Sequence, residues 1–269
     1  MNLTQRILKT SLGVMTLIAG LGLALITVSF GRAESDISNR LFVPMVSGGQ
    51  VATNTCNIPN TRYESLSVSG PPITVDPDTD PNLNLGYRGY EPVNASLTFV
   101  SYGPATDRSA PQFPAMFVDN RVPAFVKTYH RYRWDVGCNC PVDTYSPWPA
   151  TVLGLRTRPA EVIAAPNSGY DIGGGNEFLV LYAGETGITL HIGRDDDLTG
   201  YTIHIDDVCV EPDLLALYRR LHSAGRGELP VLRGGQPFGR AVGDEIKIAV
   251  RDYGHFLDPR SRNDWWQGK

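Results

Sequence analysis

Alternating charged residues mark one segment near the C-terminus as a candidate binding surface. In EIKIAVRD, Glu245, Lys247 and Arg251 lie in one phase of the segment together with an alanine, and isoleucine and valine fill the other phase. A period of two is typical of a half-buried β-strand, which places these charged side chains on one face. Lys247 and Arg251 suit an anionic group, and Glu245 suits a hydroxyl or an amine. We therefore predict a ligand-binding groove formed by these three residues and by His204 of the segment YTIHID.

Two histidines and a carboxylate have the chemistry of a metal site. His191 and His204 fall on the polar phase of two neighbouring predicted strands, and Asp206 shares the phase of His204. Such a set can bind zinc. Ordinary histidines on the face of a sheet explain the same pattern, and we favour that interpretation. The prediction is therefore no cofactor, and zinc held by His191, His204 and Asp206 is the alternative.

Aromatic side chains are a second kind of candidate, because their rings stack on sugars. Trp265 and Trp266 follow the polar run DPRSRND near the end of the sequence. They either pack back onto the domain or present an exposed patch that binds a polymer. Packing is favoured, because terminal segments with large apolar residues are usually tied down.

Four cysteines indicate an oxidising compartment, in which thiols pair. One residue separates Cys138 from Cys140, which would strain a bond between them. We therefore expect Cys56 and Cys209 each to pair with one of these two. A metal site built on the CNC sequence is less favoured, because no second cysteine pair or histidine pair has zinc spacing.

The elements that position these residues are predicted to be short strands. The sequence has 28 glycines and 20 prolines, and from residue 96 onward short apolar segments follow one another at hairpin spacing. One amphipathic helix is expected at about residues 211–224, in EPDLLALYRRLHSAG, with a proline in its first turn and a glycine at its end. The predicted fold is mainly β, a barrel-like or sandwich domain of short antiparallel strands with this one covering helix.

Glycine turns on either side of the charged strand resemble those of a known family. GGQPFG precedes EIKIAVRD, and GHFLDP follows it. In this order they are similar to the closing part of LytM- and lysostaphin-type zinc peptidases, whose duplicated-hybrid-motif barrel cuts peptidoglycan cross-links. RPAEVIAAPNSG, NEFLVLYAGETGITLHI and YTIHIDDVCVEP resemble earlier strands of that barrel, so the resemblance covers about residues 155–259.

The zinc-ligand motifs of that family are not retained. Glu245 and Lys247 occupy the positions of its His-x-His pair, and a lysine ammonium has no lone pair for zinc. The H-x-x-x-D motif has no counterpart, although His204 falls near the catalytic histidine of the family. The resemblance therefore implies the barrel without the enzyme. A zinc-dependent peptidoglycan endopeptidase with atypical ligands is the alternative.

The N-terminal part predicts export. Arg6 and Lys9 precede an uncharged apolar run, and a G-x-A sequence ends at Ala33. We expect a signal peptide at residues 1–33, with an uncleaved membrane anchor as the alternative. Residues 34–95 are rich in turn-forming residues and are expected to be extended and loop-rich. Residues 96–269 are the predicted globular domain.

The net charge of the chain limits the classes of partner that it can bind. A formal net charge of −4 offers no basic surface for phosphates, so no nucleic-acid partner is expected. The predicted function is an exported, non-catalytic binding domain of the envelope or the extracellular space. Its expected partner is a cell-wall or extracellular polymer, and a membrane only through an uncleaved N-terminal segment. A secreted carbohydrate-binding module is a further alternative.

Overall fold

A computed structural model of the chain describes residues 56–104 and 107–268. The signal peptide or anchor predicted for residues 1–33 lies outside this part. None of the helices in the described part is long and apolar enough to cross a membrane.

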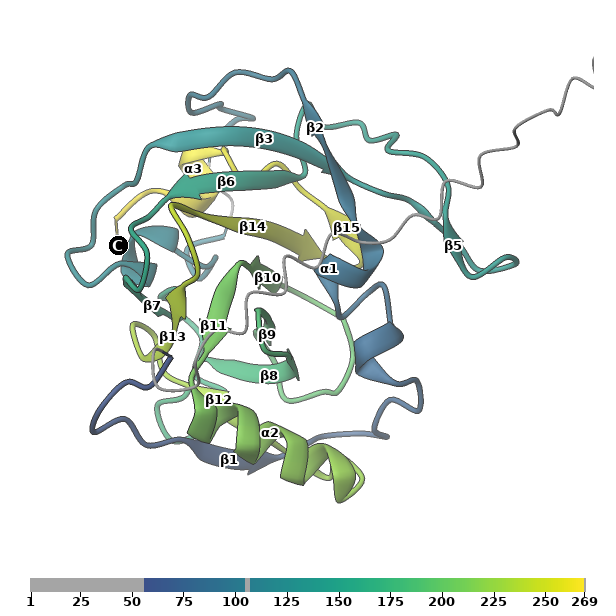
Figure 1. The fold of residues 1–269 in the computed structure, drawn as a ribbon, viewed down its shortest axis with the longest axis vertical. Coiled ribbons are helices and arrows are strands. Elements are labelled where there is room, and N and C mark those ends of the chain that lie inside the picture. The colour runs from purple at the N-terminus through teal and green to yellow at the C-terminus, as the bar shows by residue number, and fades with distance from the viewer. Residues whose placement is uncertain (1–55, 105–106, 269) are drawn as a thin grey trace, which may run out of the picture. The chain divides into compact units, whose positions relative to one another are not determined.

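The fold is mainly β and is dominated by one large antiparallel sheet (Figure 1). Its order is β1 (Glu64–Ser67), β12 (Glu228–Leu232), β8 (Phe178–Ala183), β9 (Gly187–His191), β10 (Thr202–Asp206), β14 (Glu245–Asp252), β6 (Val152–Arg156), β3 (Phe125–Arg131) and β2 (Tyr90–Val93). A short strand, β15 (His255–Phe256), pairs with the end of β14. Within the described residues, β1 and β2 are the two edges of the sheet, so the sheet is open and does not close into a barrel.

Smaller elements complete the fold. Three strands form a second sheet in the order β11 (Val208–Val210), β13 (Pro237–Ala241) and β7 (Val162–Ala164), and a separate hairpin joins β4 (Trp134–Asp135) to β5 (Cys140–Pro141). The α-helices are α1 (Leu85–Arg88), α2 (Pro212–Ser223) and α3 (Arg262–Trp265), and the 3-10 helices are Pro77–Thr79 and Phe113–Met116.

The period-two pattern of the sequence places the core. Ile246, Ile248 and Val250 of β14 are fully buried in the main hydrophobic cluster, which takes side chains from both sheets. A second, smaller cluster lies on the polar face of the large sheet, where Phe256 packs with Leu85, Tyr129, Val152 and Ala249. The middle of the sheet is therefore covered on both faces, and the face that carries Glu245 and Arg251 is partly shielded from water.

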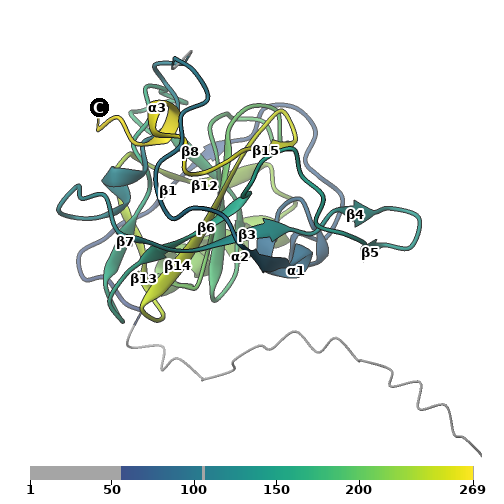
Figure 2. The same cartoon turned by 90° about the horizontal axis from the view of Figure 1, so that it is seen from above.

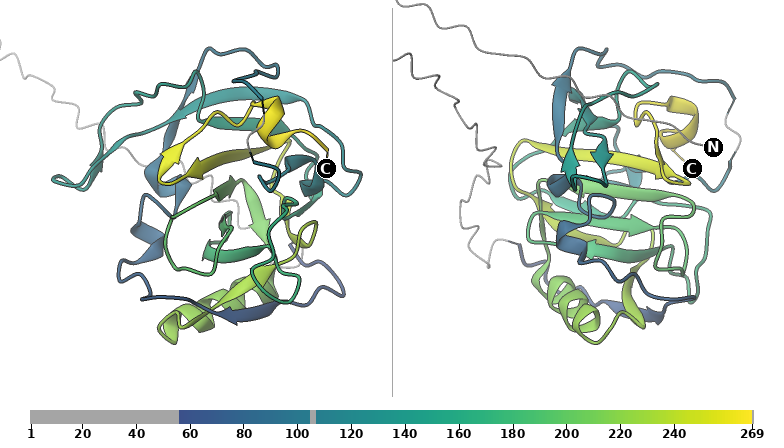
Figure 3. Two further views of the ribbon diagram at one scale, coloured as in Figure 1. Left: turned by 180° about the vertical axis from the view of Figure 1, so that it is seen from behind. Right: turned by 90° about the vertical axis from the view of Figure 1, so that its right-hand side faces the viewer.

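The predicted covering helix is confirmed as α2. The Glu211 carboxylate caps it by accepting hydrogen bonds from the backbone N–H groups of Asp213 and Leu214. Its buried side chains are Leu214, Leu215, Tyr218 and Leu221, at the spacing of one helical face. The helix packs against β12 and β8, near the β1 edge of the sheet (Figures 1 and 3).

The segment expected to be extended, residues 34–95, contributes to the fold where it is described. It supplies β1 and β2, which are the two edges of the large sheet, and its side chains Leu83 and Leu85 are buried. Conversely, ASLTFVSYG, expected to be a strand, makes only an isolated bridge between Val100 and Ser261. Four-residue edge strands carry too few alternating positions to stand out in a sequence, and a proline inside β2 is tolerated only at an edge.

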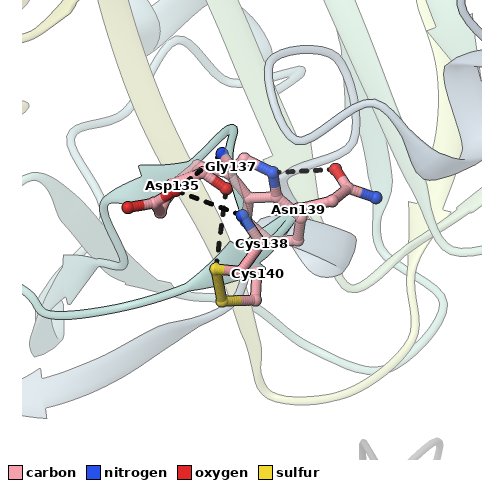
Figure 4. Close-up of a disulfide and its surroundings, with 6 residues drawn as sticks. Asp135, Gly137, Cys138, Asn139 and Cys140 are labelled. Atoms are coloured by element: carbon pink, nitrogen blue, oxygen red, sulfur yellow. Dashed lines mark hydrogen bonds between the residues drawn. A yellow bond between two sulfur atoms is a disulfide. The ribbon is translucent and has the colours of Figure 1, made fainter.

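The cysteine pairing differs from the expectation. Cys56 bonds to Cys209, and Cys138 bonds to Cys140 (Figure 4). The second bond is accommodated because Asn139, between the two cysteines, has a positive φ of 50°, a conformation that asparagine adopts more readily than most residues. The Cα atoms of Cys138 and Cys140 are 5.3 Å apart, within the usual range for a disulfide.

Two ion pairs are buried in the fold, one between distant segments and one within the segment that precedes α3. The Arg226 guanidinium, just after α2, donates two hydrogen bonds of 2.7 and 2.6 Å to Asp196, in the connection between β9 and β10. The Arg260 guanidinium donates two of 2.9 and 2.6 Å to Asp258. Both pairs are almost fully buried, so each charge depends on its partner.

Candidate ligand-binding site

The four predicted groove residues lie on one face of the large sheet. In the pairing of β10 with β14, His204 is opposite Ala249, and Asp206 is opposite Lys247. Side chains of directly paired residues lie on the same face, and Glu245 and Arg251 are in phase with Lys247 along β14. The face nevertheless has two parts: one end carries Glu245, Lys247 and Asp206, and the other carries His204 and Arg251.

The carboxylate end is held by internal contacts. The Tyr129 hydroxyl donates a 2.7 Å hydrogen bond to Glu245, and the Lys247 ammonium pairs with Asp207. The same ammonium lies 5.8 Å from the ring centres of Tyr90 and Tyr129. Glu245 is therefore already bonded to Tyr129, and Lys247 to Asp207, although the sequence predicted that both bind a ligand.

A glycine makes room for the Glu245 side chain. Gly154 of β6 is opposite Lys247 in β14, and a Cβ atom at this position would come closer than 3.0 Å to the Glu245 carboxylate. A Cβ atom does not approach an unbonded heavy atom that closely, so the carboxylate would have to move. The hydrogen bond between Tyr129 and Glu245 therefore depends on a glycine in the neighbouring strand.

Asp206 has an unusual protonation equilibrium. Its pKa is raised to about 7, chiefly by burial and further by the nearby Asp207, while Lys247 and a hydrogen bond with Tyr90 oppose the change. Gly187 lies directly opposite on β9, where an added Cβ would be 2.7 Å from an Asp206 oxygen. Asp206 is therefore confined beside the sheet and exchanges a proton near neutral pH.

The two histidines bond to threonines rather than to each other. His191 Nδ1 lies 3.3 Å from the Thr202 hydroxyl, and His204 Nδ1 lies 3.0 Å from the Thr189 hydroxyl. In the part of the chain that the structure describes, no group of three or more His, Cys, Asp or Glu side chains is arranged to hold a metal ion. His191, His204 and Asp206 therefore do not form the zinc site of the alternative interpretation.

The tautomer of His204 follows from its neighbours. The Thr189 hydroxyl donates its only hydrogen to the Leu83 carbonyl, so His204 Nδ1 must be the donor in its contact with Thr189. Burial lowers the pKa of His204 well below its usual value, and the positive charges of Arg251 and Arg88 lower it further. His204 is therefore a neutral imidazole whose Nε2 carries a free lone pair.

Three arginines gather around Phe256, and we call Arg88, Arg131 and Arg251 the arginine cluster. Their guanidinium carbons lie 5.4, 5.2 and 4.9 Å from the centre of the Phe256 ring. The His204 ring stacks on the same phenylalanine at 5.6 Å. Arg88 and Arg251 are 7% and 4% exposed, and Arg131 is partly exposed. Cation–π contacts thus hold three like charges around one ring.

None of the three forms an ion pair with a carboxylate among the described residues. Arg88 donates to the carbonyls of Pro81 and Tyr132 and to the Asn82 side chain, and Arg251 donates to the carbonyls of Asn82 and Gly254. Burial and the neighbouring arginines lower the pKa of Arg88 to about 9, against the opposing effect of Asp80. Burial likewise lowers the pKa of Arg251 to about 10. All these guanidinium groups are still charged at neutral pH.

Polar atoms without a partner concentrate at this one place. Across residues 56–104 and 107–268, four buried side-chain nitrogen or oxygen atoms have no hydrogen-bond partner: Nε and Nη1 of Arg131, Nε of Arg251 and Nε2 of His204. Three of these are donors on cations, and the fourth is the acceptor on a neutral imidazole. The arrangement can therefore bind an anionic group, and beside it a hydroxyl that donates to His204.

Two of the five residues of this site were predicted from the sequence. His204 and Arg251 were predicted, whereas Arg88, Arg131 and Phe256 were not. Arg88 lies in a segment expected to be loop, and Arg131 is one of three basic residues in HRYR, so neither stands out. β6 lies between β3 and β14 in the sheet, and this order brings Arg131 of β3 to the same site as Arg251 of β14. The order of the strands cannot be read from the sequence.

Trp265 and Trp266 are part of the core and not of the site. They are 2% and 5% exposed, and their indole N–H groups donate to the carbonyls of Asp258 and Pro259. Both pack against Phe113. The structure thus places them in the packed arrangement that the sequence favoured, and not in the alternative exposed patch.

Comparison with known proteins adds no relative, since no family model, no curated protein and no solved structure matches the chain.

Proposed function

We propose that the chain is a non-catalytic binding protein of an extracytoplasmic compartment, and that it holds an anionic, hydroxyl-bearing ligand at the arginine cluster and His204. One observation carries the proposal. Every buried side-chain polar atom that lacks a partner in the described residues belongs to Arg131, Arg251 or His204. Native proteins rarely leave such atoms unsatisfied, and those that remain require an explanation.

Charge supports an anion as the ligand. Buried guanidinium groups without a carboxylate are costly, and an oxyanion that accepts from Nε and Nη atoms compensates them with charge-assisted hydrogen bonds. Arginine presents these donors in a planar fork that matches a carboxylate or a phosphate. Arg131 is the only partly exposed member of the arginine cluster, so we take it as the point of entry.

The neutral His204 indicates a second feature of the ligand, a hydrogen-bond donor beside the anionic group. Its free lone pair requires a donor, and an anion alone supplies none. An acidic sugar unit has both parts, since its carboxylate or phosphate meets the arginines and a neighbouring hydroxyl donates to Nε2. Such units are the building blocks of many envelope polymers, which agrees with the partner expected from the sequence.

The compartment is supported by the two disulfides, which are typical of proteins outside the reducing cytosol. The predicted export signal points the same way. The resemblance of residues 155–259 to zinc peptidases stays a prediction, and a non-catalytic role agrees with the replacement of their His-x-His pair by Glu245 and Lys247.

Calorimetric titration of the purified exported form tests the proposal. The probes are oligogalacturonate and inorganic phosphate, with a neutral maltooligosaccharide as control. We expect the acidic probe to bind and the neutral one not to bind. Arg131→Gln removes one positive charge and two unpaired hydrogen-bond donors. It should therefore weaken binding at least about tenfold, and a tenfold change corresponds to about 1.4 kcal/mol.

Arg133→Gln is the matched control. Arg133 lies two residues away in sequence, is half exposed and already pairs with Asp143, so its loss should leave binding unchanged. Equal binding of the neutral sugar, or unchanged affinity in a folded Arg131→Gln variant, would overturn the proposal. Arg131 is preferred over Arg251 for the test because its partial exposure makes the substitution easier to tolerate.

A further inference from the structure

The Cys138–Cys140 disulfide lies in an exposed hairpin. β4 and β5 form their own two-stranded sheet, and Figure 2 shows this hairpin projecting from the rest of the fold. Cys138 is exposed and Cys140 is partly exposed. The other disulfide is sheltered, because Cys56 is 3% and Cys209 is 9% exposed. A thiolate in solution can therefore approach the first sulfur pair but not the second.

Contacts other than this disulfide also hold the hairpin. Asp135 Oδ1 accepts hydrogen bonds of 2.6 and 3.2 Å from the backbone N–H groups of Gly137 and Cys138, which closes the turn (Figure 4). Arg133 and Asp143 on the flanking segments form a two-point ion pair, with both nitrogen–oxygen distances at 2.6 Å. The fold therefore accommodates both the disulfide and the dithiol form.

Loop length makes this bond the weaker of the two. The bond between Cys56 and Cys209 spans 153 positions, whereas that between Cys138 and Cys140 spans two. A disulfide stabilises mainly by restricting the unfolded chain, and the effect grows with the length of the closed loop. Exposed disulfides with little structural benefit are the ones that exchange readily.

Exposed apolar side chains lie close to the disulfide in the sequence. Val136 is 92%, Tyr145 71% and Val142 49% exposed, all in the hairpin or just after it. Large apolar side chains with this exposure mark contact sites for a partner. Next to a disulfide, they suit an unstructured peptide that carries cysteine thiols and apolar residues.

We propose that Cys138 and Cys140 form a redox-active pair that oxidises peptide dithiols by thiol–disulfide exchange. A peptide thiolate attacks the exposed Cys138 Sγ, a mixed disulfide forms, and Cys140 leaves as a thiolate that takes up a proton. The second peptide thiolate then attacks the peptide sulfur of the mixed disulfide and releases Cys138. Two electrons and two protons pass from the peptide to the protein, so one peptide is oxidised per chain. This activity is independent of ligand binding at the arginine cluster.

Equilibration of the folded protein in glutathione buffers of graded redox ratio tests the first requirement. After acid quenching and alkylation, mass spectrometry counts the reduced cysteines at each ratio. We expect Cys138 and Cys140 to become reduced at a ratio of reduced to oxidised glutathione at least tenfold lower than Cys56 and Cys209, with unchanged far-ultraviolet circular dichroism. Reduction of Cys56 and Cys209 first, or of both pairs together, would overturn the proposal.

Transfer is measured with a reduced peptide that carries two cysteines between apolar residues. The native protein should oxidise about one peptide per chain, and the Cys138→Ser, Cys140→Ser double variant none. Cys140→Ser alone holds no hairpin disulfide and should not oxidise the peptide. When it is mixed with a single-cysteine peptide activated as its thionitrobenzoate mixed disulfide, the Cys138 thiolate should displace thionitrobenzoate and retain the peptide in a mixed disulfide. Val136→Ser should slow the peptide reaction several-fold and leave the reaction with glutathione unchanged. If the double variant oxidises the peptide as fast as the native protein, the assignment is wrong.

Discussion

Replacement of Asp206 by asparagine should stabilise the protein above neutral pH and change its stability little near pH 4. The variant keeps the size and hydrogen-bonding capacity of the side chain and removes its charge. Asp206 has its pKa raised to about 7, chiefly by burial, with Asp207 as a further cause. Above pH 7 Asp206 is therefore ionised in the native state, and burial makes that charged form unfavourable relative to the unfolded chain.

The magnitude follows from proton linkage. An aspartate in an unfolded chain has a pKa of about 3.9, so the folded state binds the proton more tightly between about pH 4 and pH 7. The contribution of Asp206 to stability is therefore fully present below pH 4, is lost as the pH rises through this window, and is constant above it. A gap of about 3 between the two pKa values corresponds to about 4 kcal/mol, an upper limit. Because Asp206 is partly exposed and faces Lys247, we expect about 2 kcal/mol.

Urea denaturation of both proteins at four pH values between about 3.5 and 8.5 measures the difference in free energy of unfolding. The advantage of the variant should grow from near zero at the lowest pH to its full value above pH 7.5. Glu185→Gln is the control, because the Glu185 side chain is 81% exposed in an ion pair with Arg219 and should show no such rise. An Asp206→Asn difference that is constant with pH, or a variant that is less stable at pH 8.5, would refute the reasoning.

Three further substitutions test the packing around the site and the body of the fold. Gly154→Ala should destabilise the protein by roughly 1–3 kcal/mol in thermal or urea unfolding, because the new Cβ displaces the Glu245 carboxylate from Tyr129, whereas Gly243→Ala, with open space around it, should change little. Asp196→Asn removes the charge that compensates its buried arginine partner and should cost about 3–5 kcal/mol; a cost below 1 kcal/mol would contradict this account of the pair. The double substitution Cys56→Ser, Cys209→Ser should lower the free energy of unfolding by up to about 5 kcal/mol, because it removes the long-range disulfide. Loss of the hairpin disulfide should lower it by about 1.5 kcal/mol, and urea unfolding of the two double variants should show that order.

The elements with strong periodicity were predictable from the sequence. EIKIAVRD became β14 at residues 245–252, and the amphipathic pattern with its acidic cap became α2. His204 and Arg251 were each predicted on the polar phase of a strand, and the pairing of β10 with β14 places those two phases on one face. These parts of the site depend on local geometry, which is what a sequence encodes most directly.

The rest depended on distant pairing. Arg131 belongs to the site only because β3 lies beside β6 and β6 beside β14, and Arg88 only because α1 packs on the polar face of the sheet. The Cys138–Cys140 bond was rejected on residue spacing, a rule that overlooks the left-handed backbone of Asn139. Residues 64–67 and 90–93 lacked a strand pattern because an edge strand is held by its neighbour's backbone and needs few apolar side chains of its own.

The two edge strands of the large sheet also set the order in which the molecule can form. β1 pairs with β12, so Glu64 meets Val231 across most of the length of the chain, and the Cys56–Cys209 bond closes the same long loop. Such distant contacts form slowly, because a long loop must close before any pairing stabilises it. Until β12 has been made and has paired with β8, β1 has no partner. We therefore expect the reduced chain to refold slowly from urea in an oxidising glutathione buffer, with the last phase marked by formation of the Cys56–Cys209 disulfide. We also expect the unpaired sheet edge to make partly folded chains prone to association.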